Sequence, residues 1–293
     1  MTAELSTTAT ENIVGSSGMV GSRKWLRYLA LIVLAVFFVF PVVMMVVGAF
    51  KPDDRVLGDA GSWKAFFPID FTSSNFGDAW RRANVGRLLM NSVVISTSVV
   101  AAGLVVNSLA GYALSRLRFR GRSALLAVIV ALTIIPLEAV AVPLLFLVNG
   151  WGWRDTYQVQ ILPFVANPLF IYLFYTFFLD VPREIEEAAL IDGAGPIRTF
   201  VKVVAPLAKP AYATVGILSF LAIWGQLLWP TLTTSGDKVR PLPMGMSVFV
   251  TQPPISWGDI MAFALIMSAP LMIVFFLFQR WFVQSVARSG LKG

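Results

Sequence analysis

The chain has 293 residues, of which 57% are hydrophobic and only 13% are charged, and its formal net charge is +7. This composition provides too little polar surface to cover a soluble globule, so we expect an integral membrane protein. The absence of cysteine and histidine excludes disulfides, thiolate chemistry, imidazole bases and the usual zinc and haem ligand sets. The basic residues lie beside apolar stretches, which fits an anionic inner leaflet better than nucleic acid.

Six apolar stretches of about 20 residues each are long enough to cross a hydrocarbon core of about 30 Å as helices. They lie near residues 26–50, 88–115, 124–148, 159–179, 211–232 and 260–282. Residues 1–22 are rich in Ser, Thr and Gly, and they predict a disordered tail. The basic residues before the first stretch resemble a signal peptide, but that stretch is longer than a typical signal core and lacks a clear cleavage site. The sequence therefore predicts an all-α polytopic membrane protein with an uncleaved first span.

The positions of lysine and arginine predict the orientation of these spans. The basic residues that share one side of the six-span arrangement are Arg23, Lys24, Arg27, Arg116, Arg118, Arg120, Arg122, Arg183, Arg198, Lys202, Lys209, Arg280, Arg288 and Lys292. Basic residues of the opposite segments are spread over longer loops and are interleaved with aspartates. We therefore place the first side, and both termini, in the cytoplasm.

Two loops are expected on the outer side. The loop 51–87 contains an aromatic set, Trp63, Phe66, Phe67, Phe71, Phe76 and Trp80. These residues could pack as a small cap on the membrane face, or they could dock another protein. The loop 233–259 is stiffened by its prolines and has the same two alternatives, with docking favoured.

Glu138 is the single ionisable residue expected deep within a span, where a charge costs on the order of 3 kcal/mol. It follows Pro136, which frees a backbone carbonyl. One interpretation is a carboxylate near the outer interface or hydrated by a vestibule. The other is a contact with a solute in a translocation pathway.

The loop 180–210 predicts two short helices around a glycine turn. Asp180 can cap an N-terminus, Pro182 suits a first helical turn, and the residues from Arg183 to Ile191 are good helix formers. Gly193 then supplies a residue that tolerates a left-handed C-terminal turn. Pro196 starts the second helix. Its expected apolar face is Ile197, Phe200, Val201 and Val204, and its expected end is marked by Pro206 and Pro210.

The charges of this loop distinguish two roles for its first helix. An interfacial helix could lie on lipid headgroups. The acidic cluster of Glu184, Glu186 and Glu187 would instead be repelled by an anionic membrane surface and accepted by a basic protein groove. A docking role is therefore favoured.

The fifth span carries Trp224, Gln226 and Trp229, which are candidates for the translocation pathway. Aromatic faces can stack on sugar surfaces, and an amide can bond hydroxyl groups. The alternative is helix packing for Trp224 and interfacial anchoring for Trp229.

Several classes of function lack their sequence signatures. The chain contains no Gly-x-x-x-x-Gly-Lys-Ser/Thr phosphate loop, so we expect ATP to be hydrolysed elsewhere. Paired membrane carboxylates and a Gly-x-Ser-x-Gly elbow are also absent, which argues against an intramembrane enzyme with catalytic residues. An ion-coupled secondary transporter stays possible, although Glu138 alone is weak support for it.

The string Glu187-Ala188-Ala189-Leu190-Ile191-Asp192-Gly193-Ala194 resembles the EAA motif of bacterial ABC-importer permeases, and Phe200, Pro206-Leu207 and Pro210 continue the match. Ala205 replaces a leucine that is common in the motif. Further resemblance covers nearly the whole chain and points to the maltose-type (MalG-like) carbohydrate permeases. It is carried by Asn91-Ser92, Pro136, Pro143, Gly152, Thr156-Tyr157, Trp224, Trp229-Pro230, Gln279-Arg280 and residues 290–293. Gly225-Gln226 departs from the acidic or amide pair that often follows the tryptophan in this family.

The resemblance implies a six-span permease domain over residues 23–293 in a bacterial cell membrane. It would form a pore with a second permease subunit, two copies of an ATPase subunit that binds ATP and Mg, and an extracytoplasmic solute-binding protein. No cofactor would bind this chain. The solute would be a di- or oligosaccharide, or else a glycerol-phosphate-type solute.

The resemblance also implies roles for particular residues. The loop 180–210 would present a coupling helix to the ATPase through Glu184, Glu187, Ala188, Ala189, Asp192, Gly193 and Ala194. The C-terminal tail 283–293 would reach toward the same subunit with Gly290, Lys292 and Gly293. Glu138, Trp224 and Gln226 would be candidates for the pathway, and the loop 233–259 resembles the segment that reaches into the binding protein.

Overall fold

A computed structural model describes residues 17–290 of the chain, and side chains from Lys24 to Gln279. All regular structure within these residues is helical, which confirms the predicted all-α class. The elements are α1 (Ser17–Ala49), α2 (Asp53–Gly58), η2 (Trp63–Phe66), α3 (Ser74–Arg82), α4 (Val85–Arg116), α5 (Arg122–Leu132), α6 (Leu137–Gly150), α7 (Tyr157–Val165), α8 (Pro168–Leu179), α9 (Arg183–Ile191), α10 (Pro196–Thr199), the π-helical η3 (Phe200–Val204), α11 (Ala205–Leu207), α12 (Lys209–Trp224), α13 (Leu228–Thr233), η4 (Leu242–Gly245), α14 (Met246–Thr251) and α15 (Trp257–Gly290). The predicted disordered tail, residues 1–22, falls mostly outside the described residues, and α1 begins at Ser17.

The chain divides into two compact units. One unit is the chain up to Asn75 together with Trp257–Ala262, and the other is Phe76–Ser256 with the residues from Phe263 onward. Each is described by itself below.

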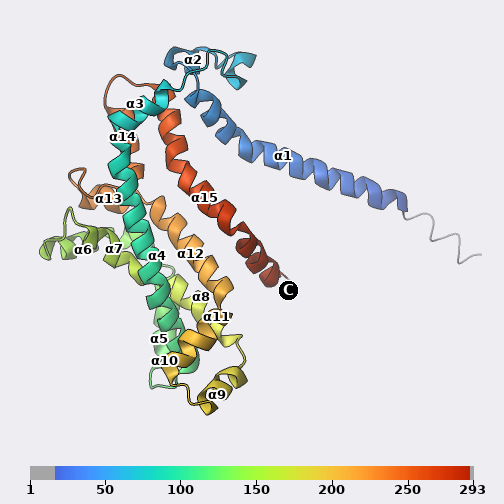
Figure 1. Ribbon diagram of the computed structural model, residues 1–293, viewed down its shortest axis with the longest axis vertical. Helices are drawn as coiled ribbons and strands as arrows, with labels where there is room; N and C mark the ends of the chain where they lie inside the picture. Colours follow the sequence, from blue (N-terminus) through green and yellow to red (C-terminus); the bar gives the residue numbers. More distant parts are fainter. Residues whose placement is uncertain (1–16, 291–293) are drawn as a thin grey trace, which may run out of the picture. The chain divides into compact units, whose positions relative to one another are not determined.

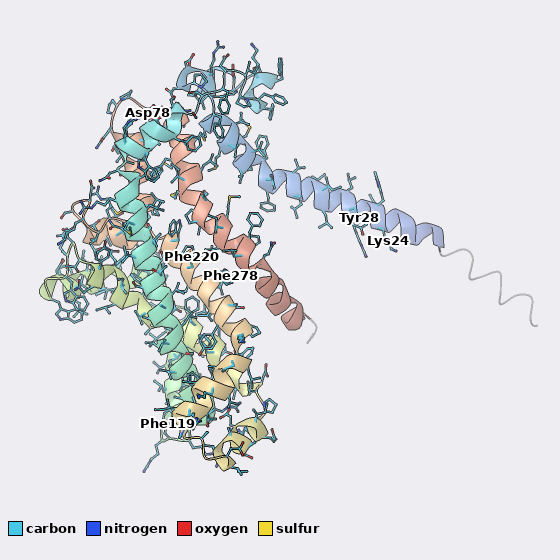
Figure 2. The ribbon with its side chains drawn as sticks, in the orientation of Figure 1. Lys24, Tyr28, Asp78, Phe119, Phe220 and Phe278 are labelled. Carbon is cyan, nitrogen blue, oxygen red and sulfur yellow. The ribbon has the colours of Figure 1, made fainter. Side chains whose placement is uncertain are left out.

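In the first unit, buried polar side chains hold the segment after α1. The Lys51 ammonium lies 3.1 Å from the Asp59 carboxylate and donates to the Lys64 carbonyl at 2.6 Å. The Asn75 amide donates to the carbonyls of Ala49 and Lys51 at 2.9 and 2.7 Å. By contrast, the aromatic residues Trp63, Phe66, Phe67 and Phe71 are exposed. Polar anchors rather than an aromatic core therefore hold this segment. Lys24 and Tyr28 stand out from α1 in Figure 2, and most of that helix is exposed.

Four of the six predicted spans have described helical segments that are long and apolar enough to cross a membrane. They are Lys24–Ala49, Val85–Arg116, Tyr157–Leu179 and Trp257–Gln279. The other two are bent pairs of helices, and the count reaches six when each pair is taken as one span.

The third predicted span, 124–148, is not one continuous helix. Its halves α5 and α6 are bent by 104°, and α6 lies across the direction of α4 in Figure 1. Three turn bonds end α5, and Pro136 then becomes the N-cap of α6 with extended backbone. The physical reason is that proline has no N–H to continue the α5 ladder and disfavours helical geometry in the residue before it.

The fifth predicted span, 211–232, ends early. Helix α12 stops at Trp224, and α13 starts separately at Leu228. At its other end, α12 is bent by 79° from the short helices of residues 196–207. The apolar run continues across the turn at Gly225-Gln226, so hydropathy alone could not mark this break.

Helix α4 is central to the second unit because α7, α8 and α12 all pack along it. At Gly111 an added Cβ would lie 2.6 Å from the Cβ of Phe174, so only glycine permits this approach of α4 to α8. Between α7 and α8 the chain breaks at Ala166-Asn167, and Asn107 of α4 binds the groups freed there. Its amide nitrogen donates to the Val165 carbonyl at 2.9 Å, and its oxygen accepts from the Asn167 N–H at 2.9 Å. Unpaired backbone groups would cost several kcal/mol each in a membrane interior, so Asn107 makes the break tolerable.

Candidate functional site: the helix α9 and its anchor

Helix α9 carries the acidic half of the loop 180–210 and lies, with α10, at the Arg116 end of α4 (Figure 1). Its C-terminus has the predicted glycine turn, since Gly193 has a φ of +80°. The Ala194 N–H donates to the Ala189 carbonyl and the Gly193 N–H donates to the Leu190 carbonyl, each at 3.0 Å. These two bonds form a Schellman motif, which satisfies carbonyls that the helix end would leave free.

The N-terminus of α9 differs from the prediction. Pro182 is the N-cap and the helix begins at Arg183, while Asp180 is the C-cap of α8. Glu184 and Glu186 occupy the first turn, where a negative charge interacts favourably with the positive end of the helix dipole.

The surface of α9 and the following turn is exposed and partly apolar. Glu184, Glu187, Ala188, Asp192 and Gly193 are all exposed, whereas Ala189 and Ala194 are half-buried. Two large apolar side chains flank the turn with almost no cover, Ile191 at 85% exposure and Ile197 at 82%. This part of the surface is therefore both apolar and acidic.

Glu186 is the one buried side chain of α9, and it anchors the helix to α4. One carboxylate oxygen lies 2.7 Å from Arg116 Nε as an ion pair, without the alignment of a hydrogen bond, and both side chains are at most 12% exposed. The other oxygen accepts from the Tyr112 hydroxyl at 3.1 Å. The Arg116 guanidinium also donates to the Val181 carbonyl just before α9. The sequence showed Glu186 only as one member of an acidic cluster and Arg116 only as one of many basic residues.

The second half of the loop follows the prediction in part. Pro196 opens α10, and the helical path through α10, η3 and α11 ends at Leu207, beside Pro206 as predicted, whereas Pro210 is the second residue of α12. A proline in the first turn costs no intrahelical hydrogen bond, which explains the position of Pro210. The expected apolar face is also split, because Phe200 and Val204 are buried in the core around α8 whereas Ile197 and Val201 are exposed.

The candidate pathway residues lie in different surroundings. Trp224 is fully buried, and its indole N–H donates to the Met267 carbonyl at 3.0 Å. Trp229 is buried as well and donates to the Val159 carbonyl at 2.8 Å, so the expectation of an interfacial anchor is wrong. Glu138 is exposed in the first turn of α6, and Gln226 is partly exposed at the end of α12. Trp229 packs in a cluster with Leu137, the residue before Glu138, whereas Trp224 contacts Phe220 and Met267.

The predicted contacts of the C-terminal tail concern few described residues. Gly290 ends α15, and Lys292 and Gly293 lie outside the described residues. Over the part of the chain that the structure describes, no group of three or more acidic side chains could hold a metal ion.

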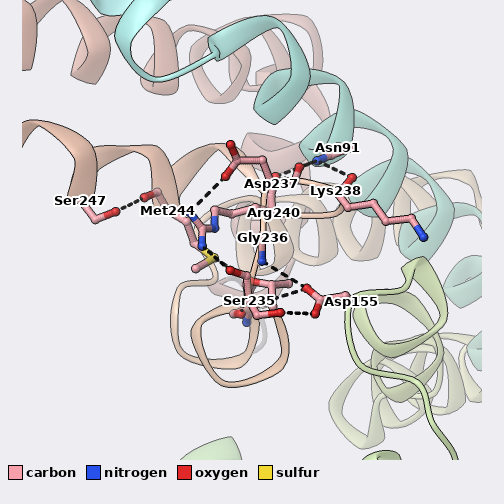
Figure 3. Close-up of polar contacts among 11 residues, drawn as sticks. Asn91, Asp155, Ser235, Gly236, Asp237, Lys238, Arg240, Met244 and Ser247 are labelled. Atoms are coloured by element: carbon pink, nitrogen blue, oxygen red, sulfur yellow. Dashed lines mark hydrogen bonds and ion pairs between the residues drawn. The ribbon is translucent and has the colours of Figure 1, made fainter.

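The loop 234–240 is fixed at the other end of α4 (Figure 3). The Asn91 amide donates to the carbonyls of Asp237, Lys238 and Arg240 at 3.3, 3.3 and 2.9 Å. On the other flank, the Asp155 carboxylate accepts bonds from the hydroxyl and the N–H of Ser235. The Ser235 hydroxyl, and after it the Ser235 N–H, hold the pKa of the Asp155 carboxyl below its ordinary value. The loop therefore has a fixed conformation while its side chains from Ser235 to Lys238 stay exposed.

Comparison with known proteins identifies the family. The model of the family described as "Binding-protein-dependent transport system inner membrane component" matches residues 103–288, which is more than half of the chain. The trehalose/maltose transport system permease protein of Thermococcus litoralis is 30% identical over 92% of this chain and 98% of its own. The diacetylchitobiose uptake system permease protein of Streptomyces coelicolor is 30% identical over 89% of this chain and 87% of its own. The arabinooligosaccharides transport system permease protein of Halalkalibacterium halodurans is 29% identical over 92% of this chain and 97% of its own.

A solved structure shows the same fold. It is described as a bacterial ABC transporter involved in the import of the acidic polysaccharide alginate, and it matches with a TM-score of 0.81 and 21% identity over 92% of this chain and 98% of that one. The helical fold and the family match agree with the resemblance found in the EAA-type string. The chain therefore belongs to the family of binding-protein-dependent transport system inner membrane components, the permease subunits of ABC importers.

Proposed function

We propose that this permease forms half of the translocation pore for a di- or oligosaccharide and receives the energy of ATP hydrolysis at α9 from a separate ATPase subunit. The observation that carries the proposal is the surface of α9. The helix is capped at Gly193, exposes Glu187, and leaves Ile191 and Ile197 almost uncovered beside the turn. A short capped helix with apolar and acidic side chains fits a partly basic groove of a partner protein. Because α9 is short and capped, a movement of the partner would displace the helix rather than bend it.

The arrangement around α4 supports the predicted orientation. The arginines from Arg116 to Arg122 and helix α9 lie at the same end of α4 (Figure 1). The positive-inside rule assigns that end to the cytoplasm, where the two ATPase copies would bind. The loop 234–240 then lies outside, where a solute-binding protein would dock. A second permease subunit would complete the pore in the inner membrane, with both termini of this chain in the cytoplasm.

The solute class is proposed from the relatives, whose names include trehalose, maltose, diacetylchitobiose and arabinooligosaccharides. Glu138 and Gln226 remain candidates for the pathway because both keep exposed surface. The packing of Trp224 against Phe220 and its bond to Met267 favour a structural role instead. ATP and Mg would bind the partner ATPase.

Glu187→Lys tests the coupling role. We expect the variant to insert normally and to lose association with the ATPase by tenfold or more, because reversing a charge in a docking surface opposes the partner's charge. Arg120→Glu is the matched control, since it also reverses one exposed charge at the same end of α4 but lies outside α9. Wild-type ATPase affinity in Glu187→Lys would refute the coupling role.

Uptake into vesicles tests the solute class. Trehalose, maltose, diacetylchitobiose and glycerol 3-phosphate are offered separately to the assembled transporter with ATP inside or with an ion gradient alone. ATP-dependent uptake of a disaccharide supports the proposal. Uptake of glycerol 3-phosphate would indicate the alternative solute class, and uptake driven by the gradient alone would indicate a secondary transporter.

A further inference from the structure

Helix α4 is attached at its Arg116 end to α9. Glu186 is the one buried side chain of that helix, and its carboxylate contacts Arg116 and Tyr112, which both belong to α4. The Arg116 guanidinium also binds the Val181 carbonyl, so it holds the segment that leads into α9 as well. A buried ion pair resists separation because each charge would otherwise be left without a partner. A displacement of α9 must therefore act on the end of α4.

The other end of α4 is attached to the loop 234–240 by several hydrogen bonds. The two N–H groups of the buried Asn91 amide are shared among three carbonyls of this loop, and its oxygen accepts from the Tyr157 hydroxyl at 2.7 Å. The adjacent Ser92 hydroxyl accepts from the Leu242 N–H at 2.7 Å. Figure 3 shows the loop carbonyls turned toward Asn91. The loop therefore follows the position of α4 and cannot move independently without losing these bonds.

Between the two attachments α4 is one helix without a proline. Asn91 and Arg116 are separated by about 37 Å along the axis, which is more than the thickness of a hydrocarbon core. The close contact at Gly111 and the bonds of Asn107 fix the helix against α7 and α8 along this length. Few positions of the helix are thus free to absorb a displacement by bending.

We propose that α4 is a mechanical strut that couples the outer loop 234–240 to α9, with Asn91 and the Arg116–Glu186 pair as its positioning residues. The inference rests on the proposed function, which places the binding protein at the loop and the ATPase at α9. A closure of the ATPase dimer moves α9, the ion pair moves α4, and Asn91 moves the loop. Coupling between two binding sites is reciprocal, so a protein that docks at the loop changes the affinity of α9 for the ATPase by the same factor.

A spin label on the outer loop tests the strut without knowledge of the solute. Because this chain has no cysteine, Lys238→Cys provides its one labelling site, and the Lys238 side chain is exposed. The assembled transporter, with the partner subunits made free of cysteine, is placed in nanodiscs and trapped with ATP and vanadate. In the otherwise unchanged chain, trapping on the inner side is expected to change the mobility spectrum at position 238.

Three further variants carry the same label. Glu186→Gln and Asn91→Ala are each expected to abolish the trapping-dependent change at position 238, while the ATPase stays associated and still traps vanadate. Thr97→Ala, which removes a side chain bonded only within α4, is expected to keep the change. If Glu186→Gln fails to assemble, Asn91→Ala, at the far end from the ATPase, still decides the question.

The outcomes separate the strut from the proposed function. Absence of any ATPase association or vanadate trapping in the unchanged chain would contradict the proposed function itself. Normal trapping with no response at position 238 would overturn the strut. A response that persists in Asn91→Ala or in an assembled Glu186→Gln would overturn it as well, because the displacement would then reach the loop by another route.

Discussion

The turn at Gly193 allows a quantitative test of the coupling surface. Its φ of +80° is a left-handed conformation, and an added Cβ would meet no atom within 4 Å. A substitution at this position therefore acts through backbone conformation alone. Alanine costs about 1–2 kcal/mol there, a β-branched residue costs more, and asparagine costs less because it visits this region more readily.

If α9 must keep its Schellman turn to bind the ATPase, these costs appear in the dissociation constant. One to two kcal/mol corresponds to an increase of about 5- to 30-fold for Gly193→Ala. We expect the order Gly, Asn, Ala, Val from tightest to weakest, measured by titrating purified ATPase subunit onto the permease in nanodiscs. Gly195→Ala is the matched control, since Gly195 also has open space around it but has a φ of −71°.

Two results would refute this reasoning. Equal weakening by asparagine and alanine would show that the left-handed conformation is not the cause. Wild-type affinity in Gly193→Val would show that the turn plays no part in docking.

Three other perturbations test the contacts that hold the second unit together. Arg116→Met should destabilise the protein by about 3–5 kcal/mol because it leaves the buried Glu186 carboxylate unpaired. The double variant Arg116→Met with Glu186→Leu should recover most of that loss in thermal-stability measurements. No recovery in the double variant would contradict a simple buried pair. Asn107→Ala should lower the free energy of unfolding by a few kcal/mol in the same assay, because the Val165 carbonyl and the Asn167 N–H lose their partner. A decrease below about 0.5 kcal/mol, the lower limit for one net hydrogen bond, would show that other groups replace the Asn107 amide. The lowered pKa of Asp155 stabilises the folded loop above the unfolded value of about 3.9, and this contribution disappears as the pH falls through the folded pKa. A label at position 238 should therefore gain mobility below about pH 4, and Asp155→Asn should remove this pH dependence.

Local signals in the sequence were reliable where the backbone preference of one residue sets the local conformation. The end of α9 at Gly193 and the start of α10 at Pro196 were both predicted, because a left-handed glycine and a proline in the first turn act within a few residues. The same local logic placed the end of that helix beside Pro206 and was insufficient only at Pro210, which begins α12. A proline excludes itself from a helix interior, but it does not say whether the helix lies before or after it.

Apolar runs predicted six spans, a number that the structure reaches when each bent pair is taken as one span, but they did not predict the bends. The breaks at Ala166-Asn167 and Gly225-Gln226 lie inside runs that stay apolar. Asn167 and Pro168 start α8 locally at the first break, but the backbone groups freed there are paired by Asn107, about 60 residues earlier in the chain. Periodicity and hydropathy carry no information about such a distant partner.

The sequence by itself determined that this protein is a polytopic helical membrane protein, that the loop 180–210 carries an acidic helix ended by a glycine turn, and that its motif is that of an ABC-importer permease. These conclusions follow from composition, local backbone preference and an ordered string of residues. Only the tertiary structure decided which member of the acidic cluster is buried, that Trp229 packs in a core, and that α4 is tied at both ends. The reason is that each of these facts depends on partners far apart in the chain, such as Trp229 and Val159, 70 residues apart, which only the folded arrangement of helices brings together.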